Sequence, residues 1–156
     1  MSNQGIRGYY LITEKIRDEL LKDINVKTVT TGDISQINLG KQYIFPLAHI
    51  LVNNVTVGEQ TLRVNLNIMS MDIVNQSKDE VVDKFQGNTN EQDILNTQLA
   101  VLNKLIQVLG RGDLYTDKYQ LDGEPICDPF YDRFENNLAG WNANVDVIIY
   151  NDITIC

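Results

Sequence analysis

The amino-acid sequence predicts an α+β protein with a mostly antiparallel sheet, one long helix packed on the sheet and a second helix at the N-terminus. Two stretches carry apolar residues at every third or fourth position, which is typical of helices that cover a core on one side. Runs of alternating apolar and polar residues are grouped before and after the second stretch. This grouping favours an antiparallel sheet over alternating β-α-β units. With 156 residues, the chain is most simply one domain, 1–156.

The N-terminal part predicts a helix at Gly8–Lys22 and then a short strand at Asn25–Thr31. In the helix, charged residues lie between the members of an apolar stripe. These members are Tyr9, Ile12, Ile16 and Leu20. The strand is followed by Gly32-Asp33, a pair that commonly ends a strand in a turn.

A β-hairpin is predicted next, with arms Phe45–Val57 and Gln60–Val74 joined by a tight turn at Gly58-Glu59. In the second arm the apolar residues move from even to odd positions near Ile68–Met69. A β-bulge there would explain the change, because one extra residue turns all following side chains to the other face. Burial of both faces beyond this point is the alternative, and the sequence leaves both open.

A polar stretch, Asn75–Asn90, predicts a long loop, of a length that is usually functional or disordered. The long helix follows at Glu91–Leu109, where leucines and isoleucines step by three and four. Asn90 is expected to cap the N-terminus of this helix. Gly110 is expected at the C′ position, just after the C-terminus of the helix, where glycine is favoured.

The tripeptide Arg111-Gly112-Asp113 matches a cell-adhesion sequence, but its place predicts a turn that ends the helix. An extended segment, a turn at Asp122-Gly123 and an irregular stretch are expected after it. The chain then closes on its most regular predicted strand, Ala139–Ile155. One face of this strand is apolar and includes Trp141, which we expect either in the core or at a subunit contact. The other face is mostly asparagine and aspartate.

Composition limits the possible functions. The net charge is −8 and the 13 lysines and arginines are scattered, which argues against a protein that grips nucleic acid through its phosphates. The two cysteines, Cys127 and Cys156, lack the spacing of metal ligands and are interpreted as free thiols in a reducing compartment. We find no pattern of a signal peptide and no apolar run long enough to span a bilayer.

Few residues could take part in catalysis or ligand binding. The one histidine, His49, lies in an alternating apolar run and is interpreted as a buried or interfacial residue with a local hydrogen bond. Asp72 lies in a strongly apolar strand, where a carboxylate must be paired, hydrogen-bonded or at a subunit contact. A cluster of carboxylates is interpreted as solvated turns rather than a cation site, because it lacks the ligand spacing of a calcium loop. Its members are Asp117, Asp122, Glu124, Asp128, Asp132 and Glu135.

We therefore predict no catalytic, cofactor-binding or metal-binding residue, and no cofactor. The seven tyrosines are typical of protein–protein contacts, although tyrosine is also common in half-buried sites.

Several segments together resemble small virion proteins of tailed bacteriophages. These segments are "FPLAHILVNN", "LRVNLNIMSMDIVNQS", the leucine-rich helix and "FYDRFENNLAGWNANVDVIIYNDITIC", within residues 39–156. The nearest resemblance is to proteins of crAss-like phages that infect gut Bacteroidota. The expected element order, a helix, a mostly antiparallel sheet and a long helix across it, also resembles the tail-terminator fold.

The resemblance implies a structural ring protein of the virion neck or head-proximal tail, assembled in the host bacterial cytoplasm. Such a ring, a tail terminator or connector, holds six or twelve copies of one chain. It would join the portal or connector to the tail tube and let double-stranded DNA pass through its lumen without specific binding, away from any membrane. The alternative is a small soluble enzyme or ligand-binding domain that uses His49 and Asp72.

Overall fold

The computed structural model of the chain describes residues 4–32, 45–74, 90–133 and 138–151. The predicted α+β class is confirmed: within these residues two helices accompany five strands. The elements in chain order are α1 (Gln4–Leu21), β1 (Thr28–Thr31), β2 (Leu47–Val57), β3 (Thr61–Ile73), α3 (Glu91–Leu109), β4 (Tyr119–Arg133) and β5 (Leu138–Tyr150). Of the predicted loop 75–90, only Asn90 belongs to the described residues, and the predicted end of the closing strand, 152–155, lies outside them.

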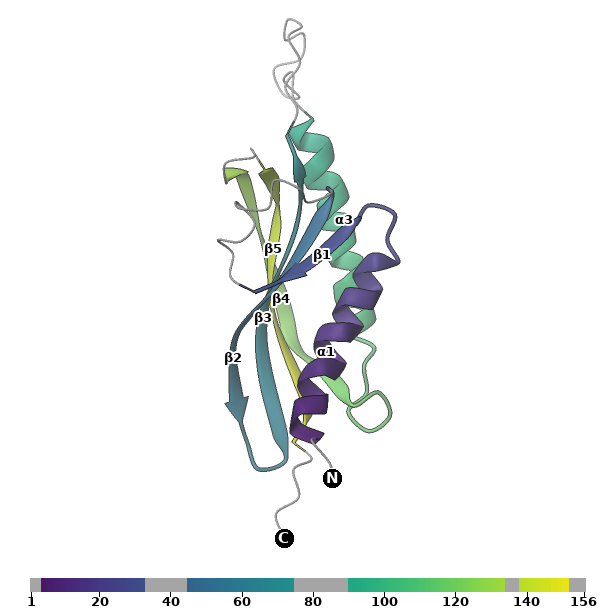
Figure 1. Ribbon diagram of the computed structural model, residues 1–156, viewed down its shortest axis with the longest axis vertical. Coiled ribbons are helices and arrows are strands. Elements are labelled where there is room, and N and C mark those ends of the chain that lie inside the picture. The colour runs from purple at the N-terminus through teal and green to yellow at the C-terminus, as the bar shows by residue number, and fades with distance from the viewer. Residues whose placement is uncertain (1–3, 33–44, 75–89, 134–137, 152–156) are drawn as a thin grey trace, which may run out of the picture.

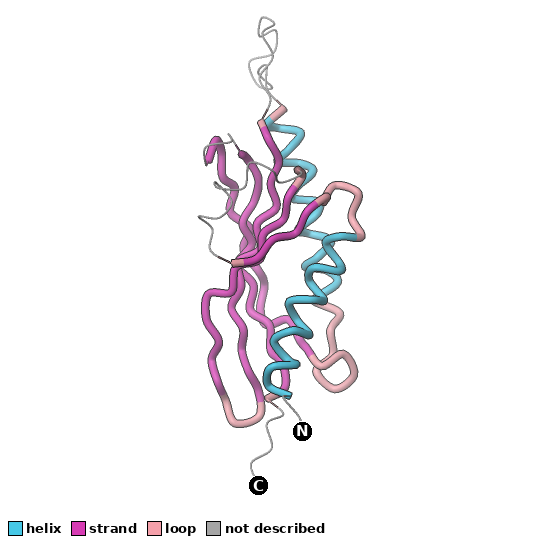
Figure 2. The backbone as a smooth tube through the Cα atoms, viewed as in Figure 1, coloured by secondary structure: helices cyan, strands magenta, loops and turns pink. Residues whose placement is uncertain are grey.

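The described strands form one sheet in the order β1-β2-β3-β5-β4. Strand β1 runs parallel to β2, and the other three pairs are antiparallel. Both helices lie on the same side of the sheet, so that the molecule has one layer of strands and one of helices (Figure 1; Figure 2). The predicted helix on one face is therefore joined by a second helix on that face, and the opposite face of the sheet has no described helix.

The main core lies between the helices and the sheet. Helix α1 contributes its predicted stripe, with Ile12 and Ile16 fully buried, and α3 contributes Leu102 and Leu109. The sheet contributes alternate residues of its central strands, as the two-residue period of a strand requires. These are Val64, Leu66 and Ile68 of β3 and Ala143, Val145, Val147 and Ile149 of β5.

A second, smaller apolar cluster lies on the opposite face, at the end of the sheet away from the β2–β3 turn. It contains Leu47, Met69, Met71, Phe130 and Leu138. Consequently β3 is buried on both faces along its second half, with Met69, Ser70 and Met71 all nearly inaccessible. Strand β3 pairs with β5 without interruption from Thr61 to Ile73. Of the two alternatives that the sequence left open, the bulge at Ile68–Met69 is therefore wrong, and burial of both faces explains the change of phase.

The register irregularities fall in other strands. One lies in β2 between Val52 and Asn54. Another lies in β4 between Asp122 and Ile126, where Gly123 has a φ of 75°. The turn predicted at Asp122-Gly123 is therefore wrong as a chain reversal, because the strand continues through it with a local irregularity that glycine accommodates.

Helix α3 has the predicted bounds, but its ends differ from expectation. The Asn90 side chain makes no capping hydrogen bond and instead donates to the carbonyl oxygen of Ile73 over 3.4 Å. Gly110 has right-handed helical angles, φ −66° and ψ −14°, rather than the left-handed conformation. Helix α1 begins earlier than predicted, at Gln4, and ends at Leu21.

Candidate functional site

The most distinctive surface is on the helix-free face of the sheet, in the half near the β2–β3 turn. Alternate residues of β2, β3 and β5 point to this face, and here they are amides and a carboxylate instead of the apolar residues of the second cluster. We name this surface the amide face. It consists of Asn53, Asn65, Asn67, Asn144 and Asp146.

The side chains of the amide face form a continuous hydrogen-bond network across three strands. Asn53 of β2 donates from Nδ2 to Oδ1 of Asn65 over 2.8 Å. Asn65 in turn donates to Oδ1 of Asp146 over 2.8 Å and to Oδ1 of Asn144 over 3.1 Å. Asn144 donates to Oδ1 of Asn67 over 2.8 Å. Each amide supplies both donor and acceptor, so the network fixes the side chains of neighbouring strands against one another.

The charged side chains beside this network carry a net negative charge. Arg63 of β3 forms ion pairs with the carboxylate of Asp122 on β4 and, over 3.7 Å, with that of Asp146 on β5. Two carboxylates therefore surround one guanidinium. An anion such as a phosphate group gains little from an arginine that is already paired in this way. The surface can form hydrogen bonds with water while holding polyanions weakly.

His49 occupies a structural position between β1 and β2. Its side chain is 1% exposed, with Nδ1 2.7 Å from Oγ1 of Thr30 and Nε2 2.8 Å from the carbonyl oxygen of Gly32. A carbonyl only accepts, so Nε2 carries the hydrogen, and Nδ1 of a neutral ring accepts from the threonine hydroxyl. The interpretation of His49 as buried and locally hydrogen-bonded is confirmed.

Asp72 lies on the opposite face of the sheet from His49. The uninterrupted β3 places Asp72 on the same side as Ser70, whose hydroxyl bonds to Gln98 of α3, whereas His49 is paired with Met69 of the second cluster. Burial raises the pKa of the Asp72 carboxyl, and a 2.7 Å hydrogen bond from the backbone N–H of Ile73 partly opposes this effect. The structure does not bring His49 and Asp72 together in one site.

The described side chains of the carboxylate cluster also do not converge on one point. Within the part of the chain that the structure describes, no three histidine, cysteine or acidic residues are arranged to hold a metal ion. Asp122 pairs with Arg63, and Asp117 accepts from the backbone N–H of Asp113 over 3.0 Å. The side chains of Asp132 and Glu135 lie outside the described residues.

The tripeptide at residues 111–113 is a helix-ending turn, as predicted. The backbone N–H groups of Arg111 and Gly112 donate to the carbonyl oxygens of Val108 and Leu109. The Asp113 side chain accepts from the N–H of Tyr115 over 2.7 Å, which holds the following turn.

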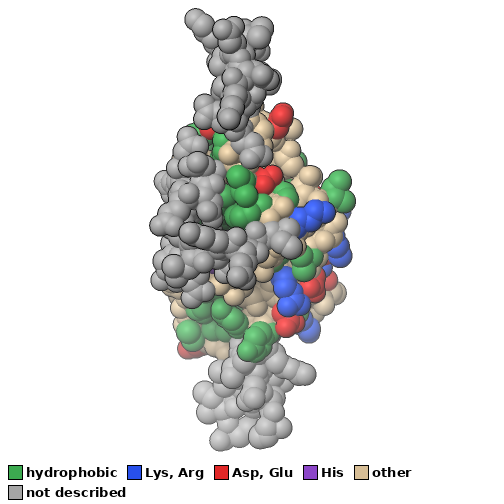
Figure 3. Space-filling view, turned by 45° about the horizontal axis from the view of Figure 1, so that its top comes forward, with side chains coloured by type: hydrophobic (Ala, Val, Ile, Leu, Met, Phe, Trp, Pro, Cys, Tyr) green, Lys and Arg blue, Asp and Glu red, His purple; other side chains and the backbone are tan. Residues whose placement is uncertain are grey.

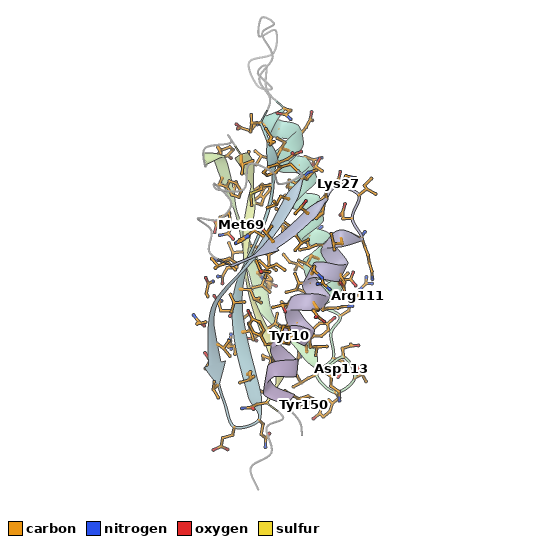
Figure 4. All side chains as sticks on the ribbon, viewed as in Figure 1. Tyr10, Lys27, Met69, Arg111, Asp113 and Tyr150 are labelled. Atoms are coloured by element: carbon orange, nitrogen blue, oxygen red, sulfur yellow. The ribbon has the colours of Figure 1, made fainter. Side chains whose placement is uncertain are left out.

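An aromatic hollow of about 410 Å³ opens at the end of the molecule near the β2–β3 turn. Tyr10 of α1 and Tyr150 of β5 line it from different elements (Figure 4), together with Lys118. The Lys118 ammonium lies 5.8 Å from the centre of the Tyr150 ring, and Lys118 has a positive φ of 70°, which is uncommon for a residue with a side chain. Tyr115 stands beside Tyr150 and is 80% exposed.

Charged side chains of both signs are intermixed elsewhere on the surface. Figure 3 shows them gathered on the side of the molecule where α1 lies. On this helix Glu19 accepts from Lys15 over 3.1 Å and from Lys22 over 3.0 Å. This surface therefore has the mixed charges of an ordinary solvated helix.

Only part of the amide face was predictable from the sequence. Asn144 and Asp146 belong to the polar face predicted for the closing strand, but Asn53, Asn65 and Asn67 were not expected to join them. Their signal is present in "VNN", which has two adjacent asparagines, and in "RVNLN", where asparagine occupies alternate positions of a strand. Without the strand order, however, the sequence does not show that these positions are adjacent.

None of the helices among the described residues is both long and apolar enough to cross a membrane. No protein-family model matches the sequence, and no curated protein sequence matches it.

Proposed function

We propose that the protein is a structural ring subunit of a tailed bacteriophage, located in the neck or head-proximal tail, and that the amide face lines the channel through which double-stranded DNA passes. The proposal combines the sequence resemblance described above with one structural observation. The helix-free sheet face carries a hydrogen-bonded network of amides, and its neighbouring arginine is paired with two carboxylates.

A channel for DNA must be wetted and yet hold phosphates weakly. Asparagine side chains are polar and uncharged, so they keep a water layer without attracting the phosphate backbone. Asp122 and Asp146 add negative charge beside Arg63. Because the amides bond to one another, they have few donors left for a passing strand. These properties favour sliding over binding.

Exposed aromatic side chains are available for contacts between subunits. Tyr9 and Tyr10 of α1 are 41% and 56% exposed, and Tyr115 near the same end is 80% exposed. Tyrosine gives a contact a large rigid area with a polar tip and is enriched at protein–protein interfaces. We assign the aromatic hollow and its surroundings to the contacts between neighbouring copies in the ring.

The ring would contain six copies as a tail terminator or twelve as a connector next to the portal. Its neighbours would be the portal, other neck rings or the tail tube. The enzyme alternative loses its geometric basis, because the two side chains on which it depends lie on opposite faces of the sheet.

The position of the amide face can be tested by giving it charge. A variant with Asn65→Lys, Asn67→Lys and Asn144→Lys adds three cations to this face. A control with Asn96→Lys, Asn103→Lys and Gln107→Lys adds the same charge to exposed positions of α3. Both are assembled, checked by native mass spectrometry and mixed with either linear or covalently closed circular duplex DNA. Only linear DNA can thread a closed ring.

We expect the amide-face variant to retain linear DNA in a salt-dependent manner and to retain closed circular DNA weakly. The control should treat the two forms of DNA alike. Equal retention of both forms by the amide-face variant would place this face on the outside of the assembly and would contradict the proposal.

A further inference from the structure

The edge of β2 is open over half of its length. Strand β1 pairs with β2 only at Leu47–Ile50, and the N–H of Gly32 donates to the Ile50 carbonyl oxygen over 3.3 Å. Gly32 has a φ of 105°, and β1 ends beside it. From residue 51 to 57, no described strand pairs with the outer side of β2, which forms the border of the sheet (Figure 1). We name residues 51–57 the open edge.

The open edge has few of the features that usually prevent strands from pairing between molecules, and its one irregularity is the register shift between Val52 and Asn54. Its sequence, "LVNNVTV", contains no charged residue and no proline. From Asn53 to Val57 every residue is exposed, with Val55 at 39% and Val57 at 72%. Valine and threonine also favour extended structure.

The opposite border of the sheet, β4, is protected in several ways. It contains Pro125 and Pro129, which cannot donate a backbone hydrogen bond. Its register with β5 breaks twice, and Gly123 adopts a positive φ within the first break. Bulges and prolines are the usual means of blocking an edge strand. The contrast singles out the open edge of β2 as the border that can accept another strand.

We propose that the open edge pairs, antiparallel, with the open edge of a second copy of this chain, joining the two sheets into one. The distribution of charge favours this pairing. Each chain carries a net charge of −8, so two copies repel one another over most of their surfaces. The open edge carries no charge, whereas β4 presents Glu124 and Asp128 as exposed side chains.

The open edge is also complementary to itself. Val55 and Val57 are paired with Val64 and Leu62 of β3, on the side of the helices. Asn54 and Thr56 alternate with them, on the side of the amide face. A two-fold axis through Val55 or Thr56 keeps both faces aligned. With the axis through Thr56, Val55 of each copy meets Val57 of the other, and the two Thr56 residues meet. With the axis through Val55, the two Val55 residues meet and Asn54 meets Thr56.

This pairing goes beyond the proposed ring and does not depend on it. A two-fold contact uses the same segment of both copies, so it stops at a dimer, whereas the contacts that close a ring join different surfaces. The two amide faces would lie on the same side of the joined sheet. Because only a few residues pair, the contact is small and we expect a dimer that dissociates on dilution.

Sedimentation velocity of the full chain over a series of concentrations tests the pairing. The edge variant carries Val55→Lys and Val57→Lys, and a second variant carries glutamate at the same two positions. The control carries Gln120→Lys and Ile126→Lys, which are exposed positions on β4. Circular dichroism confirms that each variant is folded.

We expect the wild-type chain and the β4 control to dimerise in the same concentration range. For each of the lysine and glutamate variants, the dissociation constant of the dimer should be at least tenfold higher than for wild type, because like charges meet across the two-fold axis. A mixture of the two should restore the dimer, since opposite charges then face each other. A wild-type chain that is monomeric throughout, a lysine variant that dimerises like wild type, or a mixture that fails to associate would overturn the proposal. The loss of rings with this dimer intact would instead count against the proposed function.

Discussion

At the scale of single residues, the amide face depends on a property that asparagine has and lysine or glutamate lacks. Asn65 accepts from Asn53 and donates to Asn144 and Asp146 at the same time, so that one side chain links three strands. The sequence predicted the polar face of the closing strand. It did not predict these bonds, because they depend on which residues of β3 and β5 are opposite each other.

Asp72 should make stability depend on pH. Burial raises the pKa of its carboxyl in the folded protein above the unfolded value. The protonated form therefore favours folding, and this contribution is complete below the unfolded pKa, about 4, and is lost as the pH rises through the folded pKa. Asp72→Asn keeps Oδ1 as an acceptor for Ile73 and removes the buried charge.

We expect Asp72→Asn to unfold at higher urea concentration than wild type near about pH 7, and at the same concentration near about pH 3. Asp128→Asn, which removes an equal charge from an exposed position of β4, serves as control. An Asp72→Asn variant that is less stable than wild type at neutral pH would show that the carboxylate forms a stabilising contact.

Gly140 is required by the close approach of β5 to β3. A Cβ at this position would overlap the carbonyl oxygen of Ser70 and lie 2.8 Å from Cα of Met71. Gly140→Ala must push the two central strands apart, and we expect a loss of more than about 3 kcal/mol in the free energy of unfolding. Urea unfolding followed by circular dichroism measures this loss.

Gly123→Ala is the matched control. Gly123 has a positive φ of 75° and nothing within 4 Å of the added Cβ, so only the backbone conformation opposes the change. We expect a cost of about 1 kcal/mol. Equal costs at the two positions would mean that the close contact at Gly140 relaxes without penalty.

At the scale of elements, the periodicity of apolar residues predicted the structure of a segment that is buried on one side. It was ambiguous for a segment that is buried on both sides. Helix α3 has one stripe, and its bounds, Glu91–Leu109, were predicted from this stripe together with Asn90 before it and Gly110 after it. Strand β3 is covered on both faces beyond Ile68. Its apolar residues at odd positions look the same in the sequence whether a bulge or a second cluster accounts for them.

Trp141 connects the sheet to α3 and should therefore stabilise the single subunit. Its Nε1 donates to the carbonyl oxygen of Leu95 over 2.7 Å, and its ring packs against the main core. We expect Trp141→Phe to lower the free energy of unfolding by about 1–2 kcal/mol, through the lost hydrogen bond and the smaller ring. Tyr131→Phe, at a position 52% exposed, should change it by less than about 0.5 kcal/mol.

Circular dichroism during urea unfolding of the diluted subunit measures both variants. If Trp141→Phe unfolds like wild type and only assembly is impaired, the principal role of Trp141 is at a subunit contact, which is the other position that the sequence allowed.

At the scale of the whole molecule, the two faces of the sheet differ in their side chains and in what covers them. The helices cover one face and form the main core, while the opposite face is divided between an apolar cluster and the amide face. The α+β class and the helix on one face were predictable from the grouping of strands around a single long helix. The parallel β1, the second cluster and the open edge were not, because they depend on the order of strands in space.

The proposed closure of copies of this chain into a ring is tested most directly by native mass spectrometry with negative-stain microscopy. The edge variant with Val55→Lys and Val57→Lys should be measured beside wild type, because it lacks the proposed two-fold pairing and leaves only the ring contacts. We expect both proteins to form closed rings of six or twelve copies as the concentration is raised. An edge variant that stays monomeric at every concentration, with wild type never exceeding two copies, would contradict the account.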